Sequence, residues 1–552
     1  MPENILVATA WPYTNNYLHL GHIAGCYLPA DIFARYQRAR GNKVIMVSGS
    51  DQHGTPVTIA AEAEGVRPID IVNKYRKNHL EVWESLGISY DLFTTTGTDN
   101  HIDTVQDIFT KLYNKGLIYK KNMTLLYSEI DNRFLADRYV EGTCPDCNFE
   151  KARGDQCDQC GKPMDALELI NPISKLSGDT PIPKESEHFF LKLSALEQPL
   201  LDWIKKNDYW KPNVKNFSLK YLTEGLKDRA ITRDIEWGIP IPLEGYETKR
   251  IYVWFEAVIG YLSASKEWAQ IQNKPDEWQK FWFDKNARSY YFLGKDNIPF
   301  HTIIWPGILL GYENHNLPYD VPANEYMNLS GAKFSKSENR AVWTHEFLEK
   351  FSADALRYYI VSNMPENSDS DFTWEEFLRR NNDELVATLG NLIHRILTFT
   401  FRNFDSKIPE PKKIETSDEK LISEIFITKE KVESNLDICK FRESMRNIMN
   451  LAQNTNRYLD SEAPWHSIKT DRDRAGTTMW VSLYAISAIK TFLYPFMPNA
   501  SLQLGNYLGI SSDIDKPTWE IQKPKSGTTL ETPLPLFKKL EIDIENPLAD
   551  EK

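Results

Sequence analysis

The chain has 552 residues, 41% of them hydrophobic, so it is too long for a single hydrophobic core and should form several globular domains. Its 65 Lys and Arg against 77 Asp and Glu give a net charge of -12, which argues against a DNA-packaging protein. We therefore expect no DNA partner, and any RNA partner must bind to local basic patches on the surface.

The N-terminus and the most apolar stretches carry no membrane or secretion signal. MPENILVATAWPYTNN lacks a basic segment followed by a long apolar one, and the most apolar late stretch is interrupted by Lys490 and Pro495. A cytoplasmic protein with no membrane partner is expected.

The first 55 residues have the pattern of a βαβ unit. Residues 5–10, ILVATA, form an apolar run of strand length, residues 19–38 suit a helix that Gly41 can end, and KVIMVSG from residue 43 indicates a second buried strand. Such units form parallel sheets, which bind ligands beyond the carboxyl ends of their strands. The segments NNYLHLGH and GSDQHG both fall there.

Two histidines, His19 and His22, flank Gly21 at the expected start of this helix. Free backbone N–H groups and the helix dipole attract anions at such a point, so we predict a phosphate site. The histidines could instead only cap the helix. Metal binding by the pair is a weaker alternative, because no third ligand lies nearby in the sequence.

Four of the six cysteines form two CxxC pairs separated by nine residues: Cys144, Cys147, Cys157 and Cys160. Four thiolates complete the tetrahedral coordination of Zn²⁺ and leave no position for water, so one structural zinc ion is predicted. A redox role for the pairs is the weaker alternative, because nothing like a βαβ unit surrounds them.

Further strands are expected at RIYVWF (250–255) and SYYFLG (289–294), as the second half of a doubly wound domain. Beyond them, LSGAKFSKSENRAVW contains Lys333 and Lys336 in a short basic loop. Alone this loop could be an ordinary solvated turn. Together with HLGH it would place cations on both sides of a triphosphate whose α-phosphorus is attacked.

The last third of the chain has helical periodicity. A helix is expected over SADALRYYIVSN (352–363), and from about residue 385 long amphipathic patterns indicate an α-helical bundle. The end of the chain, from LPLFKK onward, suggests a short strand or a tail.

HLGH and KFSKS resemble the two signatures of the class I aminoacyl-tRNA synthetases, HIGH and KMSKS, with Phe334 in place of the signature methionine. More closely, the chain resembles the methionyl-tRNA synthetase family over essentially its whole length, in stretches such as GSDQHGTP, YVWFEAVIGY, FLGKDNIPFH and EAPW. This resemblance implies that methionine and ATP form methionyl-adenylate. The methionyl group then passes to the 3′ end of tRNA(Met), for initiation and elongation, with no covalent enzyme intermediate.

The expected architecture is an α/β, Rossmann-like catalytic domain with a doubly wound parallel sheet, in two halves (residues 1–118 and 250–327). A connective insertion with the zinc knuckle (119–249) separates them. A linking segment with the KFSKS loop (328–384) leads to an α-helical anticodon-binding domain and tail (385–552). The chain stops before the dimerisation domain that some members carry, so a monomer is expected.

The resemblance also implies site residues. The methionine pocket would comprise Trp11, Tyr13, Asp51, Trp254, Ala257, Tyr261 and His301, with Asp51 holding the α-amino group. ATP, accompanied by Mg²⁺, would be bound by Tyr13, His19, Gly21, His22, Asp296 and Lys336. Catalysis by positioning and charge stabilisation would fall to His19, His22, Lys333 and Lys336. The tRNA anticodon would be read by Asn391, Arg395 and Trp465.

Three alternatives remain open at this point. One is another class I synthetase, with the cysteinyl enzyme the nearest because it also carries zinc. The second is a nucleotidyltransferase that acts on a small molecule, and the third is a noncatalytic RNA-binding module with a zinc knuckle.

Overall fold

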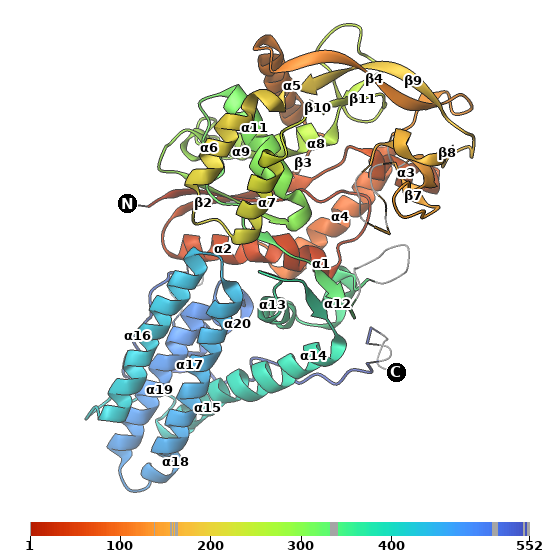
Figure 1. The fold of residues 1–552 in the computed structure, drawn as a ribbon. Helices are drawn as coiled ribbons and strands as arrows, with labels where there is room; N and C mark the ends of the chain where they lie inside the picture. Colours follow the sequence, from red (N-terminus) through yellow and green to blue (C-terminus); the bar gives the residue numbers. More distant parts are fainter. Residues whose placement is uncertain are drawn as a thin grey trace.

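The computed structural model describes residues 2–136, 139–154, 157, 159–160, 164–331, 341–510, 517–544 and 547–548. Figure 1 shows an α/β domain in the middle of the molecule, with a β-rich insertion on one side and an elongated helical bundle on the other. The predicted fold class is confirmed.

The α/β domain is built on a five-stranded sheet in the order β15-β14-β1-β2-β3, in which every neighbouring pair is parallel. Its strands are β1 (Asn4–Thr9), β2 (Lys43–Ser50), β3 (Leu92–Thr95), β14 (Arg288–Gly294) and β15 (Ala323–Asn324). The inner strands are continuous apolar runs because helices cover both faces of the sheet. The strands predicted from ILVATA, KVIMVSG and SYYFLG are therefore confirmed.

The helix predicted over residues 19–38 is also confirmed, although it contains a π-helical turn. It comprises α1 (Leu20–His22), the π-helix η1 (Ile23–Tyr27) and α2 (Leu28–Ala39). The other helices of this domain are α3 (Thr55–Glu64), α4 (Pro68–Leu86), α5 (Asp99–Asn114), α8 (Val253–Glu256), η5 (Ala257–Ile259), α9 (Gly260–Ile271), α10 (Gln279–Trp282), η6 (Lys295–Asn297), η7 (Phe300–Ile304) and α11 (Trp305–Tyr312).

The strand predicted at RIYVWF is wrong. Only Arg250–Ile251 form a strand, β13, and the chain turns into α8 at Val253. A short apolar run bounded by no turn signal is equally compatible with a buried strand and a buried helix. In the helical conformation the carboxylate of Glu256 contacts two histidines.

The described part of the insertion contains antiparallel sheets and the helices α6 and α7. The long hairpin-like pair β4 (Ile118–Ser128) and β9 (Ile182–Leu191) lies at the far side of the α/β domain from the bundle (Figure 1). It is extended by β5 (Arg133–Phe134) and β10 (Arg229–Ala230); β6 (Val140–Thr143), β7 (Ala152–Arg153) and β8 (Ile170–Ser174) form the knuckle sheet. The remaining elements are η3 (Ala166–Glu168), η4 (Leu193–Leu196), α6 (Glu197–Lys206), α7 (Pro212–Thr223), β11 (Thr232–Arg233) and β12 (Ile239–Pro240).

The linking segment and the bundle follow the sheet. The segment has β16 (Met327–Leu329), α12 (Thr344–Lys350), α13 (Ala353–Ser362), β17 (Ser370–Phe372) and α14 (Trp374–Arg379). The bundle has η8 (Arg380–Gly390), α15 (Asn391–Asn403), α16 (Thr416–Asp437), α17 (Phe441–Glu462), α18 (Pro464–Ser467), α19 (Arg472–Leu493) and α20 (Pro498–Tyr507). The helical predictions for this region are confirmed. The described residues after 517 contain no strand.

The buried α19 is the central helix of the bundle, packed against α16, α17 and α20. None of the helices that the structure describes is long and apolar enough to cross a membrane.

A buried arginine fixes the bundle to the α/β domain. The guanidinium of Arg357, on α13, lies 2.7 Å from Oδ2 of Asp31 on α2 and donates to the carbonyl of Leu86. The same guanidinium donates to the carbonyl of Phe496, between α19 and α20. Because Arg357 and Asp31 are fully buried, either one without the other would be an unpaired buried charge. The linking segment thus ties three parts of the chain into one body.

Candidate active site

A cavity of 920 Å³ opens at the carboxyl ends of β1, β2 and β14, against η5 and α9. It brings together residues that the sequence placed in one site although they come from distant segments: Trp11, Tyr13, Asp51, Trp254, Ala257, Tyr261, Asp296 and His301. Ligand binding at this edge of a parallel sheet is the usual arrangement in doubly wound folds.

Asp51 directly follows strand β2, is buried, and is one of the residues that line the cavity. Its backbone pairs with that of Tyr13, and among the described residues its Oδ1 has no hydrogen-bond partner. Burial raises the pKa of the Asp51 carboxyl well above its usual range, and the negative charge of Glu256 raises it further. A cation at this point would complete the hydrogen bonding and stabilise the charged carboxylate.

Glu256 is fully buried and joins two histidines beneath Asp51. Its Oε1 lies 2.8 Å from Nδ1 of His53, and its Oε2 lies 2.8 Å from Nε2 of His101. Burial would raise the pKa of Glu256, but the charge and hydrogen bonds of the two histidines bring it below its usual value. Sequence reasoning missed this network; its signal was a carboxylate inside the apolar run YVWFEAVIGY.

The indole of Trp11 lies between two glycines. A Cβ atom at Gly49 would lie 2.2 Å from Cζ3 of Trp11, and one at Gly260 would lie 2.5 Å from Cζ2. Any side chain at either position would therefore displace the ring, so both glycines make room for this wall of the cavity. The ring meets Tyr261 edge-on, with the centroids 6.4 Å apart.

A hydrogen-bonded pair of rings forms the innermost wall. Nδ1 of His301 lies 2.8 Å from the carbonyl oxygen of Asn297, which can only accept, so Nδ1 carries the proton. Nε2 of His301 must then accept from the hydroxyl of Tyr261, 2.7 Å away. Burial lowers the pKa of His301 to about 4, which keeps the ring neutral. This wall is uncharged at physiological pH.

The mouth of the cavity is aromatic and more open. Trp254 is 38% exposed, and its ring centroid lies 5.0 Å from that of Phe300. Its indole N–H donates to the hydroxyl of Tyr13 over 3.2 Å. Phe300 was not singled out from the sequence, although it lies in the stretch FLGKDNIPFH.

The HLGH segment follows β1, and none of its four residues is among those that line this cavity. His19 precedes α1, and its backbone N–H donates to Nδ1 of His22 over 3.1 Å. The two imidazoles are stacked, with centroids 3.6 Å apart. Gly21 lies within this short helix, half-buried, where its lack of a side chain leaves the backbone open to approach.

Lys333 and Lys336 lie outside the described residues, but the chain on their C-terminal side is held against HLGH. The N–H of Leu20 donates to the carbonyl of Val342 over 3.2 Å, and the N–H of Thr344 donates to the carbonyl of Leu18 over 2.8 Å. The segment that follows KFSKS is thus fixed next to the two histidines.

Asp296 is exposed on η6, directly after β14. Its neighbour Lys295 is ion-paired with Glu325 at 2.7 Å and with Asp369 at 2.9 Å. The lysine therefore has its own acidic partners from two other segments, and Asp296 faces the cavity at the end of the strand.

The four cysteines of the two CxxC pairs lie together, as predicted, in the knuckle of the insertion. Their sulfur atoms are all within 4.8 Å of one another: Cys144, Cys147, Cys157 and Cys160. The turn after the first pair places Asn148 at φ 58°, a conformation that asparagine adopts readily. This group could hold a metal ion, and it lies in a separate part of the chain from the cavity.

The three residues predicted to read the anticodon lie at one end of the bundle. Asn391 and Arg395 are exposed on α15, one turn apart, and Trp465 is half-buried in α18. The guanidinium of Arg395 lies over the Trp465 ring, 5.4 Å from its centroid, and 2.7 Å from Oδ1 of Asp460. The structure therefore brings Arg395 and Trp465 into contact across about 70 residues of sequence.

Comparison with known proteins agrees with this arrangement. The family model described as "tRNA synthetases class I (M)" matches residues 5–397, and the model described as "Anticodon binding domain of methionyl tRNA ligase" matches residues 408–548.

Curated relatives match over their full lengths. A methionine–tRNA ligase of Dehalococcoides mccartyi is 54% identical over 544 residues, which cover 99% of this chain and 98% of the relative. A methionine–tRNA ligase of Thermomicrobium roseum is 49% identical over 571 residues, which cover 99% of this chain and 98% of the relative.

Among solved structures, Mycobacterium tuberculosis methionyl-tRNA synthetase bound by methionyl-adenylate has the same fold. The TM-score between the two structures is 0.82, and the sequences are 23% identical. The match covers 98% of this chain and 100% of the Mycobacterium tuberculosis chain. From these matches, the chain belongs to the methionyl-tRNA synthetase family of class I aminoacyl-tRNA synthetases.

Proposed function

We propose that this protein is a methionine–tRNA ligase, which activates L-methionine with ATP and Mg²⁺ to methionyl-adenylate and transfers the methionyl group to the 3′ end of tRNA(Met). The observation that carries the proposal is the buried oxygen of Asp51, without a hydrogen-bond partner among the described residues, in an aromatic-walled cavity at the carboxyl ends of the strands. Full-length identity of 54% to a methionine–tRNA ligase supports it.

The cavity suits methionine at both ends. Asp51 would hold the α-ammonium group, while Trp11, Tyr261 and His301 would surround an unbranched apolar side chain, with Trp254, Tyr13 and Ala257 nearer the mouth. Contacts between a thioether sulfur and aromatic rings stabilise by about 0.3–1.5 kcal/mol each. None of the described residues that line the cavity is a cysteine, which argues against a cysteinyl-type site with zinc in its pocket.

The same edge of the sheet would take ATP. His19, His22 and the backbone at Gly21 would meet the phosphates, Asp296 the ribose, and Lys333 and Lys336 the far side of the triphosphate, with Mg²⁺ neutralising further charge. The contacts of Leu18 and Leu20 with residues 342–344 support this, because they hold the chain after KFSKS against HLGH.

The knuckle would hold one structural Zn²⁺. Four sulfurs about 2.3 Å from a tetrahedral zinc ion are about 3.8 Å apart. The separation between Sγ of Cys144 and Sγ of Cys160 is 3.9 Å, and that between Sγ of Cys147 and Sγ of Cys157 is 3.6 Å. These distances fit four thiolates around one ion and leave no position for a reacting water molecule.

Amino-acid-dependent exchange of pyrophosphate into ATP, measured with each of the twenty amino acids, tests the activity. We expect methionine alone to support fast exchange, and tRNA(Met) to accept the activated group. Fast exchange with another amino acid, or exchange without any charging of tRNA, would overturn the proposal. The second result would instead favour a small-molecule nucleotidyltransferase.

A further inference from the structure

The helix that follows HLGH contains a π-helical turn, η1, whose hydrogen bonding is incomplete within the helix. In this turn the N–H of Leu28 donates to the carbonyl of Ile23, five residues earlier. In an α-helix the same N–H would bond the carbonyl of Ala24. The residue that a continued π pattern would use instead is Pro29, which has no N–H. The helix, which is described throughout, therefore offers the Ala24 carbonyl no donor in either pattern.

The π turn is the junction between HLGH and the long helix α2. Pro29 lies in the first turn of α2, where proline is tolerated because the N–H that it lacks would have no partner. Each residue of an α-helix advances by about 100° around the axis, so the extra residue of the π turn rotates α1 by about that angle relative to α2. The turn thus sets the angle of His19 and His22 relative to the buried face of α2.

A buried asparagine from another segment completes the turn. Nδ2 of Asn324, the last residue of β15, donates to the carbonyl of Ala24 over 3.1 Å, and Asn324 is 2% exposed. A second side-chain bond holds the same turn, because Sγ of Cys26 donates to the carbonyl of Phe292 on β14 over 3.0 Å. The two bonds fix the turn to neighbouring strands of the sheet.

The other end of the Asn324 amide is held by a lysine of the insertion. Nζ of Lys211 lies 3.1 Å from Oδ1 of Asn324 and 3.3 Å from the carbonyl oxygen of Ala323. A lysine ammonium only donates and a backbone carbonyl only accepts, so Oδ1 must face Lys211 and Nδ2 must face Ala24. Lys211 directly precedes α7, so a contact from the insertion orients the amide that holds the π turn.

We propose that Asn324 is a positioning residue for methionine activation. Its amide fixes the π turn, and the π turn sets the angle at which His19 and His22 meet the triphosphate. Lys211 acts through Asn324 by orienting that amide. Without the amide donor the buried carbonyl of Ala24 would be unpaired, which favours rearrangement of the turn. The inference rests on the proposed function and adds to it a link between the insertion and the phosphate site.

The test compares Asn324→Asp and Asn324→Ala in methionine-dependent pyrophosphate exchange by the full chain. The aspartate keeps the shape and the bond to Lys211 but turns an oxygen toward the Ala24 carbonyl, and the alanine removes both bonds. Each variant should lower kcat about 10- to 100-fold, because a displacement of about 1 Å at a reacting group can cost that much. The KM for methionine should stay at the wild-type value, since Asp51 and His301 lie outside this network. Transfer of the methionyl group from preformed methionyl-adenylate to tRNA(Met) should keep its rate, because the triphosphate is then gone.

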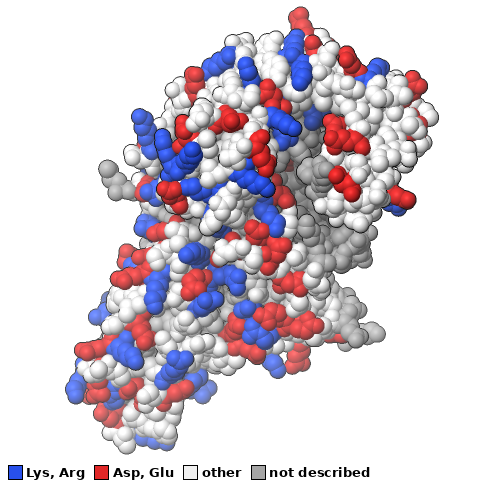
Figure 2. Space-filling model, viewed as in Figure 1, with Lys and Arg blue, Asp and Glu red and all other residues white. Residues whose placement is uncertain are grey.

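Lys211→Met tests whether the lysine acts through the amide. It should lower kcat less than Asn324→Ala does, and it should add nothing to Asn324→Ala in the double variant. Acidic and basic side chains are interspersed over the face of the molecule in Figure 2, so the loss of one charge should change the long-range field little. Lys220→Met checks this point: it removes an exposed cation from the same helix, α7, and should leave kcat unchanged.

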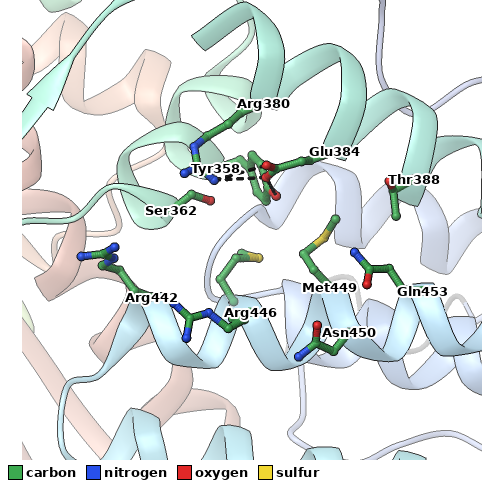
Figure 3. Close-up of a pocket in the computed structure, with 11 residues that line it drawn as sticks. Tyr358, Ser362, Arg380, Glu384, Thr388, Arg442, Arg446, Met449, Asn450 and Gln453 are labelled. Atoms are coloured by element: carbon green, nitrogen blue, oxygen red, sulfur yellow. Dashed lines mark hydrogen bonds and ion pairs between the residues drawn. The ribbon is translucent and has the colours of Figure 1, made fainter. Parts of the chain in front are cut away.

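Asn381 provides the matched control for a buried amide. It lies on η8, which is also a π-helix, and its Nδ2 donates to the carbonyl of Lys538 over 3.0 Å. Figure 3 shows this helix beside a pocket of the bundle, where Arg380 is paired with Glu384. Asn381→Ala should lower the melting temperature about as much as Asn324→Ala does, and it should leave kcat unchanged. A similar fall of kcat in both variants would mean that kcat follows stability, which contradicts the proposal.

Hydrogen exchange gives a measurement that does not depend on activity. The amides of residues 23–28 should exchange faster in both Asn324 variants than in wild-type protein, and at the wild-type rate in Asn381→Ala. If wild-type protein does not activate methionine, the proposed function fails, and hydrogen exchange still decides whether Asn324 holds the turn.

Three results would overturn the positioning role while the proposed function stands. The first is wild-type kcat in folded Asn324 variants of a protein that activates methionine. The second is a loss of kcat with an equal loss in the transfer step, which would make Asn324 a part of the general fold. The third applies if both Asn324 variants unfold, and it is wild-type kcat in Lys211→Met.

Discussion

The hydroxyl of Tyr261 donates to Nε2 of His301 over 2.7 Å, and the carbonyl of Asn297 holds the other ring nitrogen. The hydroxyl proton of Tyr261 is therefore used in the hydrogen bond to His301. Only the lone pairs of the Tyr261 oxygen remain to accept a hydrogen bond from a group in the cavity. The inner wall accepts an apolar side chain because all of its buried polar groups already have partners.

Tyr261→Phe should leave Nε2 of His301 buried and unpaired, which typically costs about 1–3 kcal/mol. Because this cost is present with and without methionine, we expect the free energy of unfolding to fall by about 1–3 kcal/mol. The KM for methionine in pyrophosphate exchange should also rise, because His301 loses the hydrogen bond that orients it in the cavity wall, while the KM for ATP stays nearly unchanged. Tyr359→Phe removes another buried hydroxyl, in the linking segment, and should affect neither constant. Equal changes in both KM values would mean that Tyr261 acts through the general fold.

Glu256→Gln should weaken the binding of the methionine ammonium group, because one of the two buried negative charges at Asp51 disappears. We expect about a tenfold rise in the KM for methionine, which corresponds to 1.4 kcal/mol. Glu267→Gln, on α9 outside the cavity, is the matched control. An unchanged KM for methionine in a folded Glu256→Gln variant would show that the two histidines alone position Asp51.

Elemental analysis should find about one zinc per chain, and Cys157→Ser should lose it, because tetrahedral structural sites need all four ligands. The knuckle should then become sensitive to protease while the cavity still binds methionine. Cys439→Ala removes a thiol outside the cluster and should keep the metal. Full zinc content in Cys157→Ser would refute the four-cysteine site.

Trp465→Ala should lower kcat/KM for tRNA charging roughly 5- to 150-fold, because stacking of a base on an aromatic ring contributes about 1–3 kcal/mol. Pyrophosphate exchange should stay at the wild-type rate, since α18 lies at the end of the bundle (Figure 1). Trp465→Phe keeps a π-face and should restore part of the charging. Parallel loss of both activities in Trp465→Ala would make this ring part of the core instead.

Asp320 offers a test of pH dependence. Its carboxyl accepts from the N–H of Val321, but burial raises its pKa to about 7, against 3.8 for the ordinary group. Between these values the folded protein holds a proton that the unfolded chain releases, so stability falls as pH rises through this range. Asp320→Asn has no carboxyl group at this position, so it should not lose stability in this way as pH rises. Its melting temperature should exceed that of wild type by more at pH 8 than at pH 5, and an equal difference at both pH values would contradict the shift.

The sequence alone identified the elements whose signals are local. The strands of ILVATA, KVIMVSG and SYYFLG are apolar runs of strand length, and the helices of the bundle repeat at helical spacing, so neighbouring residues suffice to specify them. The two CxxC pairs fix their own geometry, since four thiolates at short spacing can meet only around one point. The βαβ pattern of the first 55 residues indicated a ligand site at the carboxyl edge of the sheet, where the cavity lies.

Only the tertiary structure decided how distant residues complete the site. Glu256 meets His53 and His101 across 203 and 155 residues, and no local pattern distinguishes its buried helix from a strand, which is why RIYVWF was misassigned. Trp11 fits because Gly49 and Gly260 both lack a Cβ atom where its ring passes. Such contacts depend on the packing of segments that are far apart in sequence, and periodicity within a segment carries no information about them.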